Sequence, residues 1–121
     1  MRKILTAAAL TAGLAVSMTA QSARVYKVGE DGVKAPVLVK EVKPQYTEGA
    51  KARHVQGVVE LAAVVKTNGA IDEQVRVVQS LEPELDEQAI VAARQWKFRP
   101  GTKDGEPVNV EVHIELTFTL R

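Results

Sequence analysis

The last part of the chain alternates strictly between apolar and polar residues, and this pattern restricts the fold more than any other. From Val108 to Leu120, every second residue is apolar and the residues between are polar or charged. Successive side chains of a β-strand point to opposite faces of a sheet, so the pattern predicts one long strand with a buried face and a wet face. The chain therefore contains a sheet that buries one of its faces.

A β-hairpin is predicted upstream, from Gly57 to Ser80, around the turn Asn68-Gly69. A two-residue loop would place the apolar Val65 opposite the charged Asp72. A three-residue loop, with Gly69 in the left-handed conformation, matches only apolar residues with each other: Val65 with Ile71, Leu61 with Val75 and Val59 with Val77. We therefore predict the three-residue loop.

Two helices are predicted around the hairpin. The first is short, begins after the cap residue Thr47 and ends near Arg53. The second begins at Pro83, because a proline at the first helical position loses no hydrogen bond. The apolar stripe of this helix is formed by Leu85, Ala89, Ala92, Ala93 and Trp96. In its first turn, Asp86 is expected to accept a local hydrogen bond.

These elements predict an α+β fold: a three-stranded antiparallel sheet with both helices on one face. The long helix connects the second strand to the third, so these two strands run parallel and cannot be antiparallel neighbours. The third strand therefore lies beside the first, which gives the strand order 2-1-3. It becomes an exposed edge that can pair with another strand, and this edge is the predicted binding site. The chain's own Val37-Leu38-Val39, or a second copy in a homodimer, are alternative occupants.

The first 22 residues are interpreted as a secretory signal peptide. Arg2 and Lys3 precede an apolar run without charges, from Ile4 to Ala20, which is followed by small residues. An uncleaved membrane anchor is the alternative, since the run is at the short limit for a membrane span. The predicted organisation is a signal peptide over residues 1–22, a linker over 23–42 and a folded domain over 43–121.

Composition and motifs exclude several functions. The formal net charge is +1, from 16 basic and 15 acidic residues, so the chain offers little to nucleic acid. It contains no cysteine, which excludes disulfides, thiolate zinc sites and cysteine nucleophiles. No nucleophile motif surrounds Ser80 or another serine, so neither enzymatic activity nor a cofactor is expected.

Two local clusters have both a functional and a structural interpretation. Glu111, His113 and Glu115 share the wet face of the last strand and could hold a divalent metal. Exposed polar alternation explains them more simply, so no metal site is predicted. The cations around Trp96 and Phe98 imitate a nucleic-acid patch, but they lie at a helix C-terminus, where positive charge is favoured in any case.

From Lys43 to Leu120 the chain also carries short motifs in a specific order. They are Pro44-Gln45-Tyr46, Gly57, Asn68-Gly69, Leu85-Asp86, Gln95-Trp96-Lys97-Phe98-Arg99-Pro100-Gly101 and Gly105-Glu106-Pro107-Val108. In order and spacing they resemble the C-terminal domain of TonB, the energy-transducing protein of the Gram-negative envelope. The resemblance implies a three-stranded sheet with two helices, which agrees with the topology derived above.

The resemblance also implies a partner and a site. Members of the family bind an extended segment near the N-terminus of a TonB-dependent outer-membrane receptor, which adds as a strand beside the last strand of the domain. The stretch before the first helix also touches this segment. The corresponding residues here are Lys43, Pro44, Gln45 and Tyr46, and Val108, Asn109, Val110, Glu111, Val112, His113, Ile114 and Glu115. Thr47 departs from the family pattern, which usually has a second proline there.

The same resemblance implies a periplasmic location and a role in TonB-dependent transmembrane transport. Full transducers have a membrane anchor, a long proline-rich spacer and proton-driven motor partners in the inner membrane. Here the stretch from Gln21 to Lys43 spans at most about 75 Å. With a cleaved signal, the expected protein is a soluble binding module; with an anchor, it could engage the motor. A periplasmic interaction domain of the same fold with a non-receptor partner is the alternative function.

Overall fold

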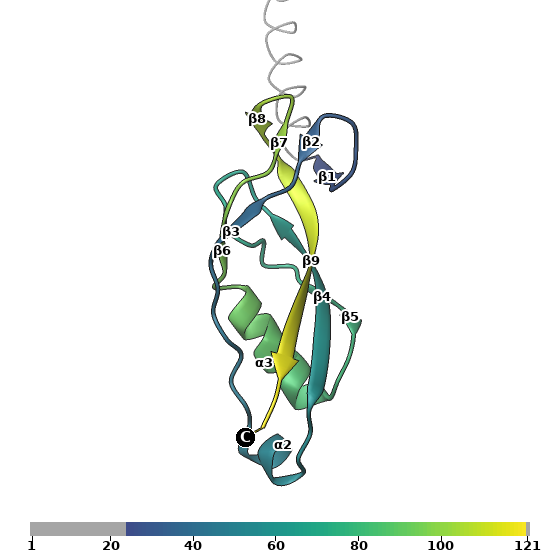
Figure 1. The fold of residues 1–121 in the computed structure, drawn as a ribbon, viewed down its shortest axis with the longest axis vertical. Coiled ribbons are helices and arrows are strands. Elements are labelled where there is room, and N and C mark those ends of the chain that lie inside the picture. Colours follow the sequence, from purple (N-terminus) through teal and green to yellow (C-terminus); the bar gives the residue numbers. More distant parts are fainter. Residues whose placement is uncertain (1–23, 121) are drawn as a thin grey trace, which may run out of the picture.

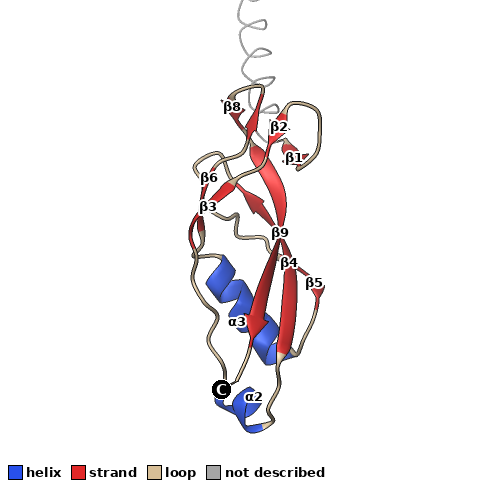
Figure 2. Ribbon diagram, viewed as in Figure 1, coloured by secondary structure: helices blue, strands red, loops and turns tan. Residues whose placement is uncertain are grey.

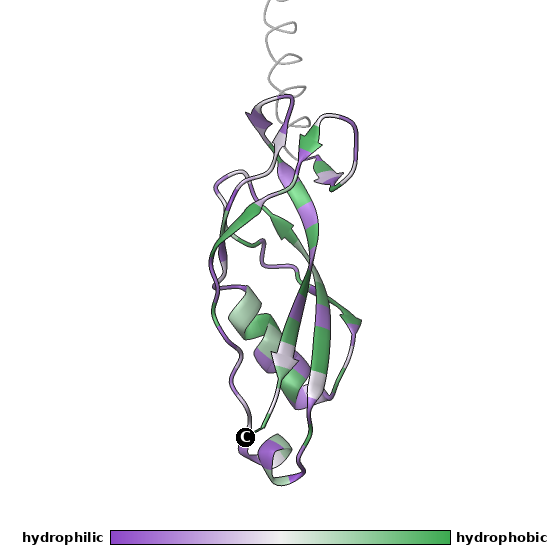
Figure 3. Cartoon of the chain, in the orientation of Figure 1, coloured by the Kyte–Doolittle hydropathy of each residue, from purple (hydrophilic) through white to green (hydrophobic). Residues whose placement is uncertain are grey.

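The predicted C-terminal strand forms the centre of the structure. In the computed structural model, which describes residues 24–120, strand β9 runs from Asn109 to Phe118 (Figure 1). It pairs antiparallel with β4, Gly57–Val65, along its whole length. Figure 3 shows the alternation along β9 as bands of opposite hydropathy. The residues of β9 that are buried are Val110, Ile114, Leu116 and Phe118, which confirms the predicted alternation.

The main sheet has four strands, in the order β1-β9-β4-β5 (Figure 2). Strand β5, Arg76–Gln79, pairs antiparallel with β4 on the side away from β9. Strand β1, Val25–Lys27, pairs parallel with the first three residues of β9. The expectation of a three-stranded sheet is therefore wrong by one strand. A strand of three residues is too short for its alternation to be recognised in a sequence.

The segment predicted to be a linker is structured over its described part. Besides β1 it contains β2, Val33–Lys34, and β3, Val37–Lys40. Two small sheets join this segment to residues 97–107. In one, β2 pairs with β7 (Thr102–Lys103), which also pairs with β8 (Glu106–Pro107); in the other, β3 pairs with β6 (Lys97–Arg99). The alternative in which Val37-Leu38-Val39 covers the last strand is therefore wrong, because this segment forms β3, which pairs with β6 through Val37, Leu38 and Lys40.

The two predicted helices form, and they begin where predicted: after the N-cap Thr47 and at Pro83. Helix α3, Pro83–Ala93, packs against the sheet and buries its whole predicted stripe: Leu85, Ala89, Ala92, Ala93 and, just beyond the helix, Trp96. Helix α2, Glu48–Ala52, follows the N-cap Thr47 and lies at the end of the sheet where β4 begins (Figure 1). The expectation that both helices cover one face is thus corrected for α2. A helix of five residues is too short to cross a sheet.

The tip of the hairpin between β4 and β5 has the predicted geometry. Val65 pairs with Ile71, and Gly69 has a φ of +86°, in the left-handed region. The tip is also bonded to β6: the N–H of Phe98 donates to the carbonyl of Gly69 at 2.9 Å. The turn therefore connects the main sheet to the small β3-β6 sheet.

Further from the tip, the hairpin register differs from the prediction. Leu61 pairs with Val77 instead of Val75, so the predicted pairing of Val77 with Val59 is wrong as well. The side chain of Asp72 accepts the N–H of Gln74 at 2.9 Å. This N–H is therefore used locally and is not available for a hydrogen bond to β4. The shift is two residues, and because side chains alternate with a period of two, Val77 still lies on the same face of the sheet as Leu61, although all of β5 is exposed.

The start of α3 is stabilised by the carboxylate of Asp86, as predicted. It accepts the backbone N–H of Leu81 at 2.9 Å and that of Glu82 at 3.3 Å, and it also accepts the hydroxyl of Ser80. A side chain inside the helix thus supplies acceptors for the chain that enters it.

Replacing Asp86 with alanine is expected to lower the free energy of unfolding by about 1–2 kcal/mol, because the N–H groups of Leu81 and Glu82 lose their acceptor. Urea denaturation followed by circular dichroism measures this loss. Glu87→Ala is the matched control, since Glu87 carries the same charge on the same helix and is exposed; we expect it to cost less than about 0.5 kcal/mol. Equal losses in the two variants would contradict the prediction.

The predicted signal peptide, residues 1–22, lies outside the described residues. Within residues 24–120, no helix combines the length and the apolar character that a membrane crossing requires.

Candidate functional site

The hydrogen bonds at the hairpin tip decide which backbone groups of β9 face outward. The N–H of Lys66 donates across the hairpin to the carbonyl of Ala70 at 2.8 Å, and the carbonyl of Val64 accepts the N–H of Asp72 at 2.9 Å. The backbone groups of Val65, between them, must therefore point the other way, toward β9, where Val65 lies opposite Val110. Val110 thus points its own backbone groups toward β4.

Alternation extends this assignment along β9. The residues that direct their N–H and C=O groups to β4 have even numbers, from Val110 to Phe118, and those that direct them away are Asn109, Glu111, His113, Glu115 and Thr117. The N–H of Leu120, just past the strand, donates at 2.9 Å to the side chain of Gln56, the residue before β4. Leu120 also has an even number, and its N–H points toward the chain that enters β4, which supports the assignment.

Strand β1 covers the beginning of this outward edge. Its three residues lie opposite Asn109, Val110 and Glu111. Among the described residues, no other strand pairs with the outward side of β9, so the open edge runs from Val112 to Phe118. Its outward backbone groups belong to His113, Glu115 and Thr117.

The predicted site along the last strand is therefore divided. Val112, His113, Ile114 and Glu115 lie on the open edge, whereas Asn109, Val110 and Glu111 are paired with β1. Val108 precedes the strand, and its N–H donates to the carbonyl of Gly101 at 3.0 Å. The open edge continues to Phe118, past the residues named one by one above but within the alternating run Val108–Leu120 whose edge is the predicted binding site.

A groove of about 560 Å³ lies beside the C-terminal half of the open edge. Lys43, Pro44 and Tyr46, three of the four residues predicted before the first helix, line one side of it. Residues 115–119 of β9 and the following loop line the other side, together with Trp96. Gln45 instead lines a smaller hollow against α3. Trp96 was assigned only to the core, so its place in the groove was missed.

Two aromatic side chains hold the wall of the groove in place. The indole N–H of Trp96 donates to the carbonyl of Val42 at 2.8 Å, and the hydroxyl of Tyr46 donates to the carbonyl of Val55 at 2.7 Å. The ring of Tyr46 also meets that of Phe118 edge to face, with centroids 5.4 Å apart. The segment before α2 is thus attached to the chain just after α3, to the chain after α2 and to the end of β9.

The wet face of β9 carries an acidic set of side chains around one histidine. Glu60 and Glu115 lie directly opposite each other on β4 and β9. His113 Nδ1 is 2.8 Å from Glu60 Oε2, and its Nε2 is 3.8 Å from Glu111 Oε2. Over the described residues, no three metal-ligating side chains are placed to hold an ion. The arrangement is an ion-pairing surface beside the open edge.

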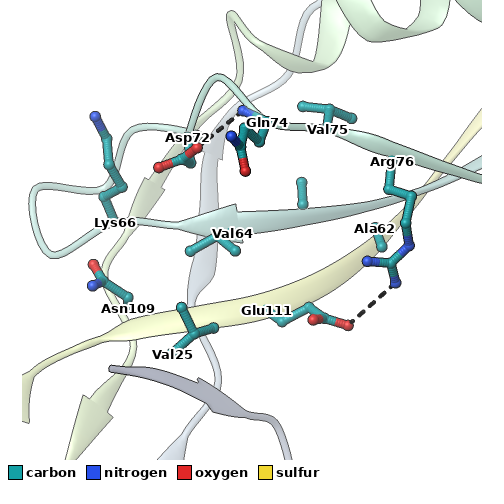
Figure 4. A pocket seen from close by; sticks show the side chains of 11 residues that line it. Val25, Ala62, Val64, Lys66, Asp72, Gln74, Val75, Arg76, Asn109 and Glu111 are labelled. Atoms are coloured by element: carbon teal, nitrogen blue, oxygen red, sulfur yellow. Dashed lines mark hydrogen bonds and ion pairs between the residues drawn. The ribbon is translucent and has the colours of Figure 1, made fainter. Parts of the chain in front are cut away.

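A second hollow, of about 540 Å³, lies on the wet face between β1 and the hairpin. Figure 4 shows Val25 of β1 and Val64 of β4 on either side of β9. Arg76 and Glu111, whose charged atoms are 4.0 Å apart, close one end of it. The hollow is lined by charges of both signs, Lys66 and Arg76 together with Asp72 and Glu111.

These features define a class of protein: a small α+β domain in which the open edge of its long last strand, Val112–Phe118, runs into a groove lined by Trp96 and Tyr46. The family model described as "Gram-negative bacterial TonB protein C-terminal" matches residues 42–120. The chain belongs to this TonB C-terminal family, which confirms the resemblance found in the sequence.

Individual relatives agree with this assignment. The chain is 35% identical over 89 residues to Protein TonB of Vibrio cholerae serotype O1, covering 73% of this chain and 36% of the relative. It is 34% identical over 77 residues to Protein TonB of Xanthomonas campestris pv. campestris, covering 64% and 34%. The chain thus spans about a third of the length of these curated relatives.

The fold is shared with a solved structure, the solution NMR structure of the Pseudomonas aeruginosa TonB CTD. The TM-score is 0.58 at 22% sequence identity, and the likeness covers 78% of this chain and 93% of that one. At this identity the likeness concerns the fold alone.

Proposed function

We propose that the chain is a TonB-like protein-binding module of the Gram-negative envelope. It binds an extended segment near the N-terminus of a TonB-dependent outer-membrane receptor, which adds as a strand to β9, and it acts in TonB-dependent transmembrane transport from the periplasm. The observation that carries this proposal is the open edge Val112–Phe118, which leads into a groove beside Lys43, Pro44 and Tyr46. Family membership supports the class of partner.

The geometry provides for both affinity and selectivity. The backbone groups of His113, Glu115 and Thr117 offer main-chain hydrogen bonds to any extended segment. Side chains of the added strand alternate, so one set falls toward the groove and its aromatic residues, and the other falls on the wet face. There, Glu60 and Glu115 face each other, and like charges in this arrangement are unfavourable. We expect a basic residue of the partner to be favoured beside Glu115.

The test uses synthetic peptides from the N-terminal segments of TonB-dependent receptors encoded in the source genome, titrated into the ¹⁵N-labelled protein. We expect chemical-shift changes at Val112–Phe118 and around the groove. Scrambled peptides of the same composition are the control and should bind at least about tenfold more weakly, since selectivity needs the right side chain in each position. Binding elsewhere, or equal binding of scrambled peptides, would contradict the proposal. The second result would favour an interaction domain with a non-receptor partner.

Three further expectations stay predictions. They are the cleavage of the signal peptide, the engagement of proton-driven motor proteins by an anchored chain, and a homodimer through the edge of β9.

A further inference from the structure

We propose that β1 is a stop that sets the length and register of the strand accepted by β9. The inference rests on the proposed function. Three of the ten residues of β9 pair with β1, which leaves seven, Val112–Phe118. At about 3.3 Å per residue, the open edge is roughly 23 Å long. A partner strand of this length fills the edge completely.

Strand β1 is fixed to the domain by its central side chain. Tyr26 is buried, with 8% of its surface exposed, although the residues on both sides of it are exposed. The guanidinium of Arg24 lies 4.4 Å from the centroid of the Tyr26 ring and covers it. A buried aromatic side chain removes a large apolar area from water, and this burial stabilises β1 in its place beside β9. An incoming strand must displace this side chain before it can extend past Val112.

The chain leaves the edge of the sheet directly after β1. The backbone N–H of Lys27 donates to the carboxylate of Glu30 at 2.6 Å, and the N–H of Glu30 donates back to the carbonyl of Lys27 at 3.2 Å. These two bonds close a turn at the point where the edge becomes open. The end of a partner strand therefore meets a folded turn, not a continuing edge.

A hollow of about 450 Å³ lies at this junction and is lined by Lys27, Val28, Glu111, Val112 and His113. It offers room for the terminal residue of the partner strand. The groove described above lies at the opposite end of the open edge, at residues 115–119. The open edge is thus bounded by one hollow at each end, and a seven-residue strand spans the distance between them.

The stop also fixes the register. Strand β1 occupies the outward edge at Asn109 and Glu111, which leaves three residues with outward groups: His113, Glu115 and Thr117. A strand that slips by two residues toward β1 loses its partner at one end, and a slip by one residue moves every side chain to the wrong face. Three outward residues between fixed ends therefore select a single pairing.

The test uses nested peptides of five, seven, nine and eleven residues, cut from a receptor segment that binds in the titration above. Isothermal titration calorimetry on the whole protein measures their affinities. In the natural protein we expect affinity to rise up to seven residues and then to stay constant within about twofold, because longer peptides find no further outward groups. Hydrogen exchange should show new protection at His113, Glu115 and Thr117 only.

The variant Tyr26→Pro is designed to release β1, because it removes both the buried ring and one backbone donor. We expect the eleven-residue peptide then to bind about tenfold more tightly than the seven-residue peptide, because it reaches the outward groups of both Glu111 and Asn109. The nine-residue peptide reaches only Glu111, so its affinity should lie between the two. Lys34→Ala is the matched control, because Lys34 is exposed and lies in the same N-terminal segment. Tyr26→Ala serves the same purpose if the proline variant does not fold.

Two results would overturn the inference while leaving the proposed function intact. One is tighter binding of the eleven-residue peptide by the natural protein, with loss of protection in β1. The other is an unchanged length profile in both folded Tyr26 variants. Absence of binding by every peptide would instead overturn the proposed function, and this inference with it.

Discussion

Replacing Gly69 with alanine is expected to destabilise the domain by about 3 kcal/mol. The φ of Gly69 is +86°, and an L-residue in the left-handed region costs about 1–2 kcal/mol. The added Cβ would also lie 2.0 Å from the carbonyl oxygen of Phe98, a backbone atom that cannot rotate away. Relief of this contact requires the turn and β6 to separate, at a further cost of about 1–3 kcal/mol. Urea denaturation measures the loss.

Gly105→Ala separates the two causes of this effect. Gly105 has nearly the same φ, +88°, but a Cβ added there meets nothing within 4 Å. Its substitution should therefore cost about 1–2 kcal/mol, the conformational part alone. If both variants lose the same stability, the contact with Phe98 contributes nothing and the turn is not tightly joined to β6.

The second large effect concerns binding, not stability. Glu115→Pro is expected to lower the affinity for a receptor peptide at the open edge by at least about tenfold. Proline removes an outward N–H, and its ring intrudes on the added strand. The N–H of Glu115 points away from β4, so no bond within the sheet is lost. Circular dichroism should show an unchanged fold, and calorimetry with the seven-residue peptide measures the affinity.

Glu115→Ala is the matched variant, since it removes the carboxylate and keeps the N–H. We expect it to bind an uncharged peptide within about twofold of the natural protein, because backbone pairing supplies most of the affinity. Peptide binding at full strength by a folded Glu115→Pro variant would show that the partner does not pair with β9 from Val112 to Phe118.

Several parts of the fold could be derived because a long pattern carried them. The alternation of the last strand extends over the whole of β9, and chance rarely produces such a run. The hairpin tip followed from the demand that apolar residues face each other across the turn, and Val65 does lie opposite Ile71. The stripe of α3 was found for a similar reason, since its residues recur at the helical period over three turns.

The parts that were missed depend on contacts that no local pattern encodes. Strand β1 has three residues, and it belongs to the sheet through its pairing with β9 and the burial of Tyr26. The shift of Leu61 to Val77 accompanies one local hydrogen bond, which the N–H of Gln74 donates to the carboxylate of Asp72. An Asp side chain often accepts the N–H of the residue two positions later, so the bond itself can be expected from the sequence. Its effect on the strand register cannot.

The candidate site was half predicted, for the same reason. The edge of the last strand follows from topology, so its open part, Val112–Phe118, could be derived from the chain alone. Its coverage at Asn109–Glu111 could not, because the strand that covers it has no signal of its own. The part played by Trp96 in the groove depends on where its N–H points, and a sequence gives only the apolar stripe to which the ring belongs.

The direction of β9 has a mechanical consequence. This strand runs along the long dimension of the described domain, and β4 supports it over its whole length (Figure 1). When a strand paired with Val112–Phe118 is pulled along its own axis, all its hydrogen bonds are strained at once. When it is lifted from one end, they break one after another, under a much smaller force. The same contact can therefore resist tension in one direction and still release its partner readily in another.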